Sequence, residues 1–316
     1  MVPCCAVFPS KNESPFPWKD PLNRPPLEDK NTHIPILEKM GIPYIADIHT
    51  HFFPEVVMKL IWKWFDKVNW EITCKGNDDK RVEVLNKNKV KYYTTLNYAH
   101  KKNMAESLNL WVYQNYKMLK GAIPFGTFYP ENKVLDYVKR SYEEYGFKGY
   151  KLHLEVGKFD INESILSPVF HYIENNKIPI VIHTGNAPLS GDYTGINFFS
   201  KFIRKYPQLY AIIAHMGAGE VEEYSTLLGE YSNLRMDTTM VFVDFYATGE
   251  NLDPFISILS EYPDQILFGS DFPNIPYNYS HPVEKLLNSG LDEDILRKVF
   301  YKNFHSLPGL DIEFSS

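Results

Sequence analysis

The stretch that decides the fold is YIADIHTHF, residues 44–52, a short β-rich run that carries Asp47, His49 and His51. Seven further runs of this kind follow it along the chain. They are KYYTTL (91–96), IPFGTFY (123–129), FKGYKLHL (147–154), IPIVIHT (178–184), LYAIIAH (209–215), LRMDTT (234–239) and ILFGSD (266–271). Short strands that alternate with longer stretches predict a parallel sheet with crossover helices.

The stretches between these runs have the periodicity of amphipathic helices. One apolar face, for example, is formed by Phe198, Phe199, Phe202, Ile203 and Tyr206. Asp292 is the predicted N-cap of the last helix. Eight strand–helix units in this length predict an α/β fold, a closed (β/α)8 TIM barrel. The alternative is an open doubly wound sheet, which usually has a glycine-rich turn after its first strand, where this chain has DIHTH.

The first 43 residues contain nine prolines. Proline fixes φ and removes a backbone donor, so this segment should be irregular or extended. We therefore predict two parts: an N-terminal arm over 1–43 that packs on the barrel, and a catalytic barrel over 44–316.

The composition excludes several classes of protein. A net charge of −6 and a pI of about 5.9, with no basic stripe, argue against a nucleic-acid partner. No apolar run reaches the ~18 residues of a membrane span, and the N-terminus lacks the basic start of a signal peptide. Three cysteines without a spacing pattern do not form a disulfide framework. We expect a soluble cytoplasmic protein that acts on a small molecule; the sequence leaves a homo-oligomer open.

Most of the unusual polar side chains lie where the predicted strands end. They are Asp47, His49, His51, Lys151, His153, His183, His215 and Asp271. Residues two apart in a strand share a face, so Asp47, His49 and His51 should point the same way. The carboxyl ends of barrel strands meet at one mouth, where catalytic residues gather. Neutral imidazoles with a carboxylate are the usual ligands of zinc and other first-row divalent metals, so we predict a metal site that activates water.

The remaining histidines lack this placement. His33 lies in the arm, His171 within a predicted helix, His281 after a turn and His305 in the last helix, and we predict structural or exposed roles for all four. His100 follows the second strand beside two lysines, where a solvated loop is favoured over substrate contact.

Several of these runs resemble the motifs of a known family. DIHTHFFP (47–54) resembles the opening motif of the amidohydrolase superfamily, and more narrowly of the amidohydrolase-related branch that includes aminocarboxymuconate semialdehyde decarboxylase. Four later stretches resemble the other motifs of that branch in the same order. They are GFKGYKLH (146–153), VIHTG (181–185), AHMG (214–217) and GSDFP (269–273). The resemblance covers about residues 44–307.

The resemblance implies a role for each matching residue. His49, His51, His183 and Asp271 would ligate the metal, and Asp271 would also accept a proton from the activated water. His215 would be the acid/base histidine. Asp47 would lie behind the ligands, where carboxylates commonly fix the tautomer of a ligand histidine, or it would anchor the barrel mouth.

Lys151 and His153 have two interpretations. A lysine at this place elsewhere in the superfamily is carboxylated and bridges two metals, with His215 then a ligand of the second. In the alternative, which the branch favours, one divalent metal is bound and Lys151 or His153 holds a substrate carboxylate. The ligand types favour zinc, with manganese, iron and cobalt also compatible.

Two reactions use the same residues. In the first, a metal-dependent hydrolase attacks a small-molecule amide, lactone or ester with activated water. In the second, a non-oxidative decarboxylase protonates the carbon that loses CO2 from a small unsaturated or aromatic acid. A decarboxylase needs a cation for the leaving carboxylate, and only Lys101, Lys102 and Lys151 are placed to supply it, which favours hydrolysis. A barrel kept only for binding is disfavoured because every ligand position is filled.

Overall fold

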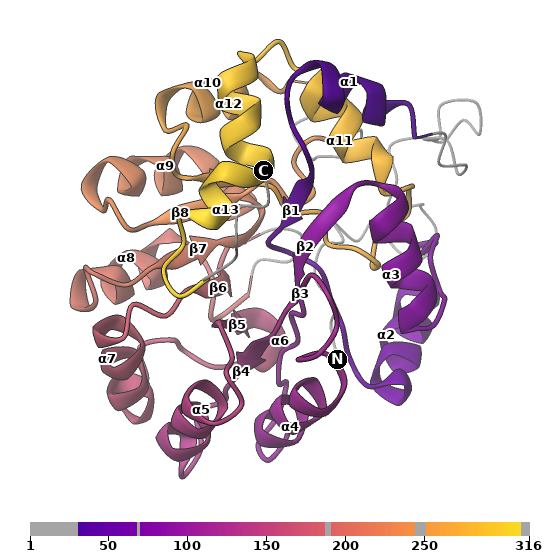
Figure 1. The fold of residues 1–316 in the computed structure, drawn as a ribbon. Helices are drawn as coiled ribbons and strands as arrows, with labels where there is room; N and C mark the ends of the chain where they lie inside the picture. Colours follow the sequence, from indigo (N-terminus) through magenta and orange to yellow (C-terminus); the bar gives the residue numbers. More distant parts are fainter. Residues whose placement is uncertain (1–30, 68–69, 187–190, 244–250, 311–316) are drawn as a thin grey trace.

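The computed structural model describes residues 31–67, 70–186, 191–243 and 251–310. Its strands are all parallel to their neighbours and lie at the centre of the molecule (Figure 1). They are β1 (Ile45–Asp47), β2 (Val90–Thr94), β3 (Ala122–Ile123), β4 (Phe125–Thr127), β5 (Gly149–His153), β6 (Ile180–His183), β7 (Ala211–Ile213), β8 (Arg235–Asp237) and β9 (Ile266–Leu267).

Hydrogen bonds close these strands into a barrel. The ladders run in the order β1-β2-β3 and β4-β5-β6-β7-β8-β9. The last strand returns to the first, because Ile48 N donates to Phe268 O at 3.0 Å and Thr50 bridges Phe272 in parallel. The (β/α)8 barrel is therefore confirmed, and the open sheet is excluded.

The third predicted strand, 123–129, is wrong as a continuous element. Pro124 interrupts it, since proline has no N–H to give to a ladder. As a result, β3 pairs only with β2 and β4 pairs only with β5. Together the two pieces fill one place in the barrel wall.

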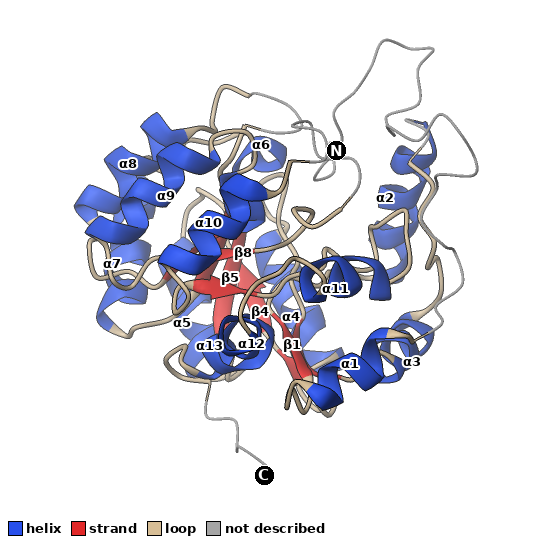
Figure 2. Ribbon diagram, turned by 90° about the horizontal axis from the view of Figure 1, so that it is seen from above, coloured by secondary structure: helices blue, strands red, loops and turns tan. Residues whose placement is uncertain are grey.

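Helices surround the strands (Figures 1 and 2). They are α1 (His33–Lys39), α2 (Glu55–Lys67), α3 (Asp78–Lys87), α4 (Ala105–Asn115), α5 (Val134–Glu143), α6 (Leu154–Gly157), α7 (Ser167–Asn175), α8 (Ile196–Lys205), α9 (Val221–Glu230), α10 (Asp253–Glu261), α11 (Ser280–Leu287), α12 (Glu293–Arg297) and α13 (Asn303–His305). Two 3-10 turns, Ser164–Leu166 and Ala214–Gly217, and a π-helical turn, Lys298–Lys302, complete the set. Asp292 is the N-cap of α12, as predicted, although its side chain makes no capping hydrogen bond.

The prediction of an irregular arm is wrong for residues 33–39, which form α1 and pack beside α11. Pro35 lies in the first turn, where a missing N–H costs no helical hydrogen bond. His33 is buried in this helix. Residues 1–30, on which the packing of the arm depends, lie outside the described residues.

Side chains alternate between the barrel interior and the helices. Val181 and Ile212 belong to the inner cluster, whereas Ile180, Ile182 and Ile213 pack outward with the helices. Phe304, Leu307 and Leu310 from the C-terminal segment belong to the inner cluster. These side chains pack there because the interior of a closed barrel is filled by side chains.

No helix within the described ranges is long and apolar enough to cross a membrane.

Candidate metal centre

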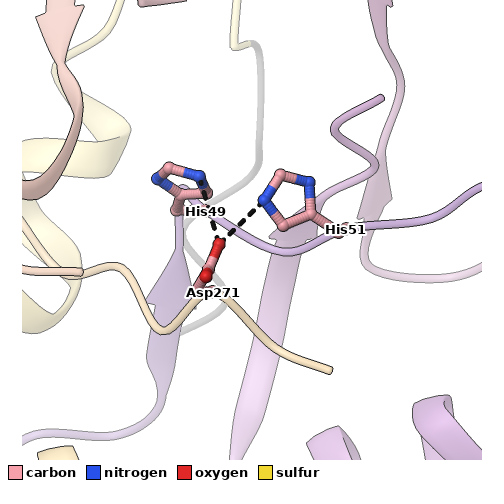
Figure 3. Close-up of side chains that lie close together, drawn as sticks. All are labelled: His49, His51 and Asp271. Carbon is pink, nitrogen blue, oxygen red and sulfur yellow. Dashed lines mark hydrogen bonds and ion pairs between the residues drawn. The ribbon is translucent and has the colours of Figure 1, made fainter. Parts of the chain in front are cut away.

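Three of the predicted ligands meet at the carboxyl ends of β1 and β9 (Figure 3). Asp271 Oδ1 lies 2.8 Å from His51 Nε2 and 3.6 Å from His49 Nε2. All three side chains are fully buried. One ligand atom from each lies within 4.8 Å of the others, so the three are close enough to bind one ion.

The other ring nitrogens show which atoms these histidines offer. His49 Nδ1 lies 2.8 Å from Asp237 Oδ2, and His51 Nδ1 lies 3.3 Å from Leu96 O. A carboxylate only accepts, so His49 Nδ1 carries the proton and its Nε2 presents a lone pair. His51 has an acceptor at both ring nitrogens, Leu96 O at Nδ1 and Asp271 Oδ1 at Nε2, and with its proton on Nδ1 its Nε2 presents a lone pair as well. Two lone pairs and a carboxylate oxygen then face one another in a buried space. A divalent cation fits this donor set, which has the nitrogen and oxygen ligands that such ions prefer.

Asp237 is a functional residue that the sequence analysis missed. Its Oδ2 accepts from His49 Nδ1, and its Oδ1 accepts from the backbone N–H of His215 at 2.9 Å and of Thr239 at 3.1 Å. Asp237 therefore orients one candidate ligand and fixes the chain near a second site residue. It ends β8, so the same strand-end rule that selected the other residues would have found it.

Asp47 lies apart from the three-residue group. Strand β1 ends there, so the alternation that would place it with His49 and His51 does not continue. Its carboxylate accepts from His49 N at 2.9 Å, Ser270 Oγ at 2.6 Å and Tyr279 OH at 2.8 Å. Asp47 thus ties β1 to the segment after β9, the anchoring role expected of it.

Lys151, His153 and His183 line the interior from β5 and β6. The ladder pairs Lys151 with Val181 and His153 with His183, and Val181 is an interior residue. Lys151 Nζ donates to His49 Nε2 at 3.2 Å. The His153 and His183 rings stack with centroids 4.1 Å apart. His183 lies outside the three-residue group, and its role as a fourth ligand remains a prediction.

His215 enters the site through an unusual backbone. It follows β7 in the 3-10 turn Ala214–Gly217, with a left-handed φ of 56°. Its ring centroid lies 5.0 Å from that of His49 and 4.7 Å from that of His183. Asp271 is also left-handed, with φ of 67°. Such conformations cost about 1–3 kcal/mol each and gather at functional sites.

Burial controls the protonation of the site. It lowers the pKa of His49, His153 and His215 well below the usual histidine value, and neighbouring histidines and Lys151 lower it further. Burial also raises the pKa of Asp271, against the opposing effect of His51, and raises that of Asp47 to about 6. These three histidines are therefore neutral at pH 7, the form that binds a metal.

The other histidines lie away from this group. His171 is exposed on α7, and His305 Nε2 lies 2.8 Å from Tyr44 OH. His281 is buried in α11, and His100 is partly exposed after β2. Lys101 and Lys102 are exposed as well.

A parallel (β/α)8 barrel with two histidines and an aspartate at its carboxyl-end mouth is typical of metal-dependent TIM-barrel enzymes. The chain belongs to the amidohydrolase family, whose model matches residues 28–303, as the motifs predicted.

Solved structures share this fold at low sequence identity. An uncharacterized TIM-barrel protein from Bordetella bronchiseptica is 16% identical, with a TM-score of 0.67 over 83% of this chain and 98% of its own. A 4-oxalomesaconate hydratase from Rhodopseudomonas palustris is 17% identical, with a TM-score of 0.57 over 84% and 96%. A 5-carboxyvanillate decarboxylase from Novosphingobium aromaticivorans, complexed with manganese, is 14% identical, with a TM-score of 0.58 over 84% and 97%. No curated protein matches the sequence.

Proposed function

We propose that the protein is a metal-dependent hydrolase of a small-molecule amide, lactone or ester. One divalent cation, with zinc favoured, would be held by His49, His51, His183 and Asp271. The observation that carries this proposal is the convergence of two histidine Nε2 atoms on one oxygen of Asp271. When bound, such a cation lowers the pKa of water and polarises a carbonyl oxygen.

Two residues are placed to move the proton. His215 Nδ1 lies 3.2 Å from Thr239 O and donates to it, so Nε2 has the lone pair of a general base. It takes the proton of the attacking water and returns it to the leaving group. Asp271 Oδ2 is buried and has no hydrogen-bond partner within the described residues, so it is a second acceptor.

Lys151 is close enough to the ligands to serve either predicted role. As an ammonium, 3.2 Å from His49 Nε2, it would bind a substrate oxygen beside a single cation. As a carbamate it would bridge two cations and make His215 a ligand. We favour one cation, in line with the branch whose motifs the chain resembles.

A non-oxidative decarboxylase of a small unsaturated or aromatic acid is the second candidate. The buried side chain of Lys151 supports it, because as an ammonium it would place inside the site a cation that can bind a carboxylate. No arginine within the described ranges follows the carboxyl end of a barrel strand, so Lys151 would be the main clamp. The decarboxylase neighbour, whose bound ligand is a nitrobenzoic acid, has the same fold.

Isotope transfer separates the two reactions. The zinc- or manganese-loaded chain is incubated with a panel of carboxylate-bearing lactones, amides and esters in ¹⁸O-water. A hydrolase places ¹⁸O in the new carboxylate. A decarboxylase, given aromatic and unsaturated acids in D2O, releases CO2 and places deuterium on the carbon that lost it.

Two variants show which residue does the chemistry. His215→Asn should keep its metal and lose about 10²- to 10⁴-fold in turnover, the usual worth of a general base. His171→Asn, at an exposed histidine on α7, should keep full activity. Equal activity of the two variants would contradict the role of His215, and product without solvent oxygen would contradict hydrolysis.

A further inference from the structure

His153 has the opposite tautomer to two other histidines of the site, His49 and His215. The structure makes it the N-cap of α6, where its Nδ1 accepts from Val156 N at 3.4 Å. A backbone N–H can only donate, so this Nδ1 has a lone pair and no proton. The proton of the ring is therefore on Nε2.

The contrast with its neighbours follows from the same reasoning. Nδ1 of His49 faces a carboxylate oxygen and Nδ1 of His215 faces a carbonyl oxygen, so both must carry the proton. These two rings present Nε2 lone pairs, as a metal ligand or a base requires. His153 presents an N–H instead, so its Nε2 cannot bind a metal.

The Nε2–H of His153 is buried inside the site. The side chain is 3% exposed, and its ring stacks on His183 and contacts Tyr98 at a centroid distance of 5.1 Å. Within the described part of the chain, Nε2 has no hydrogen-bond partner. Burying a donor without an acceptor is costly, so an unpaired one in a native site calls for a functional explanation.

We propose that His153 Nε2–H is a substrate-binding donor that holds a carbonyl or carboxylate oxygen beside the reacting bond. This inference rests on the proposed function and names the group that the site recognises. Lys151 lies two residues earlier on the same face of β5, so both side chains there offer protons, Lys151 as an ammonium and His153 through Nε2–H. The substrate is therefore oxygen-rich at this end, neutral or anionic, and an ammonium group is rejected.

The tautomer is measured without knowing the substrate. Long-range ¹H–¹⁵N NMR on the zinc-loaded full chain, labelled with ¹⁵N-histidine, distinguishes protonated from unprotonated ring nitrogens. Loss of signals in His153→Asn assigns the ring. We expect the proton on Nε2 for His153, and an Nε2–H signal that moves when sodium acetate is added as the probe. A proton on Nδ1, or no response to acetate, would overturn the proposal.

A matched pair of variants tests the donor separately from the cap. His153→Gln places an amide donor near the position of Nε2, whereas the shorter His153→Asn keeps an acceptor near the helix start and leaves no donor at the position of Nε2. Both should keep the metal content of the wild type. Acetate affinity should fall about tenfold in the Asn variant, as expected for one lost hydrogen bond, and less in the Gln variant.

Two outcomes contradict the assignment. Loss of metal in both variants would make His153 a ligand, and equal acetate affinities in both would reduce it to a helix cap. Neither result depends on whether hydrolysis is observed, so failure of the proposed reaction would leave this test readable.

Discussion

Replacing Asp237 by Asn should weaken metal binding while leaving the fold intact. The backbone N–H groups of His215 and Thr239 both donate to Oδ1 and would keep the amide oxygen of Asn at that position. The amide NH2 then takes the place of Oδ2 and faces His49 Nδ1. Because NH2 only donates, His49 must accept on Nδ1 and carry its proton on Nε2. The lone pair that should bind the metal is lost.

The size of the effect follows from this change of tautomer. Loss of a carboxylate that orients a ligand histidine typically costs 10- to 100-fold in metal affinity. That range corresponds to about 1.4–2.7 kcal/mol of binding free energy. Asn has nearly the shape of Asp and keeps all three hydrogen bonds in the metal-free protein. The proton placed on His49 Nε2 displaces the hydrogen bond from Lys151 Nζ, so we expect the free energy of unfolding of that form to fall by about 1 kcal/mol.

The assay is competition of the metal-free protein with a zinc chelator, paired with urea unfolding. Asp47→Asn is the matched control, because it is also a fully buried aspartate at the barrel mouth. Its four hydrogen bonds come from two hydroxyls and two backbone N–H groups, and none comes from a histidine ring. An amide has one oxygen for them, so this control should lose about 1–3 kcal/mol of stability with little change in zinc affinity. Unchanged zinc affinity in Asp237→Asn, or an equal loss in both variants, would refute the tautomer argument.

Two further outcomes are expected. Without metal, the free energy of unfolding should fall as the pH is lowered from 7 to 6, because the unfolded chain takes up protons near pH 6.5 on the three site histidines whose pKa burial lowers. The slope over this range averages about 0.7 kcal/mol per pH unit for each histidine, because the unfolded imidazole is about half protonated there. The two buried aspartates whose pKa is raised partly offset it, and urea melts with no such fall would contradict the expectation. Gly269→Ala should lower the free energy of unfolding, measured with urea, by about 1–3 kcal/mol and should weaken zinc binding. The reason is that the added Cβ would overlap the Thr239 hydroxyl and lie 2.9 Å from His49 Cβ. A variant as stable as the wild type would show that this part of the barrel can adjust.

The barrel was predictable because its signals are local and repeated. Eight β-rich runs and amphipathic stretches such as that of α8, whose Phe199, Phe202 and Ile203 are buried, fix the class of fold. The break at Pro124 was visible in the sequence, but only the two separate ladders show that the wall is divided there. The helix at 33–39 was missed because the proline count of the whole arm outweighed a short local pattern.

The sequence predicts which residue types form the site and at which strand ends they lie. His49, His51 and Asp271 meet as expected because barrel geometry brings β1 and β9 together. The left-handed backbone of His215 was not predictable, because positive φ is uncommon at any residue with a side chain, although histidine adopts it more often than most. The tautomers of His49 and His215 depend on Asp237 and Thr239, which lie 188 and 24 residues away and which periodicity does not register.

The most direct test of the central claim is the metal content of the full chain purified without chelator, measured beside His183→Ala. We expect about one divalent ion per wild-type chain and a clear loss in the variant, which would establish His183 as the fourth ligand. Two ions per chain would favour a carboxylated Lys151. A chain that holds no metal and regains none from added zinc or manganese would contradict the account.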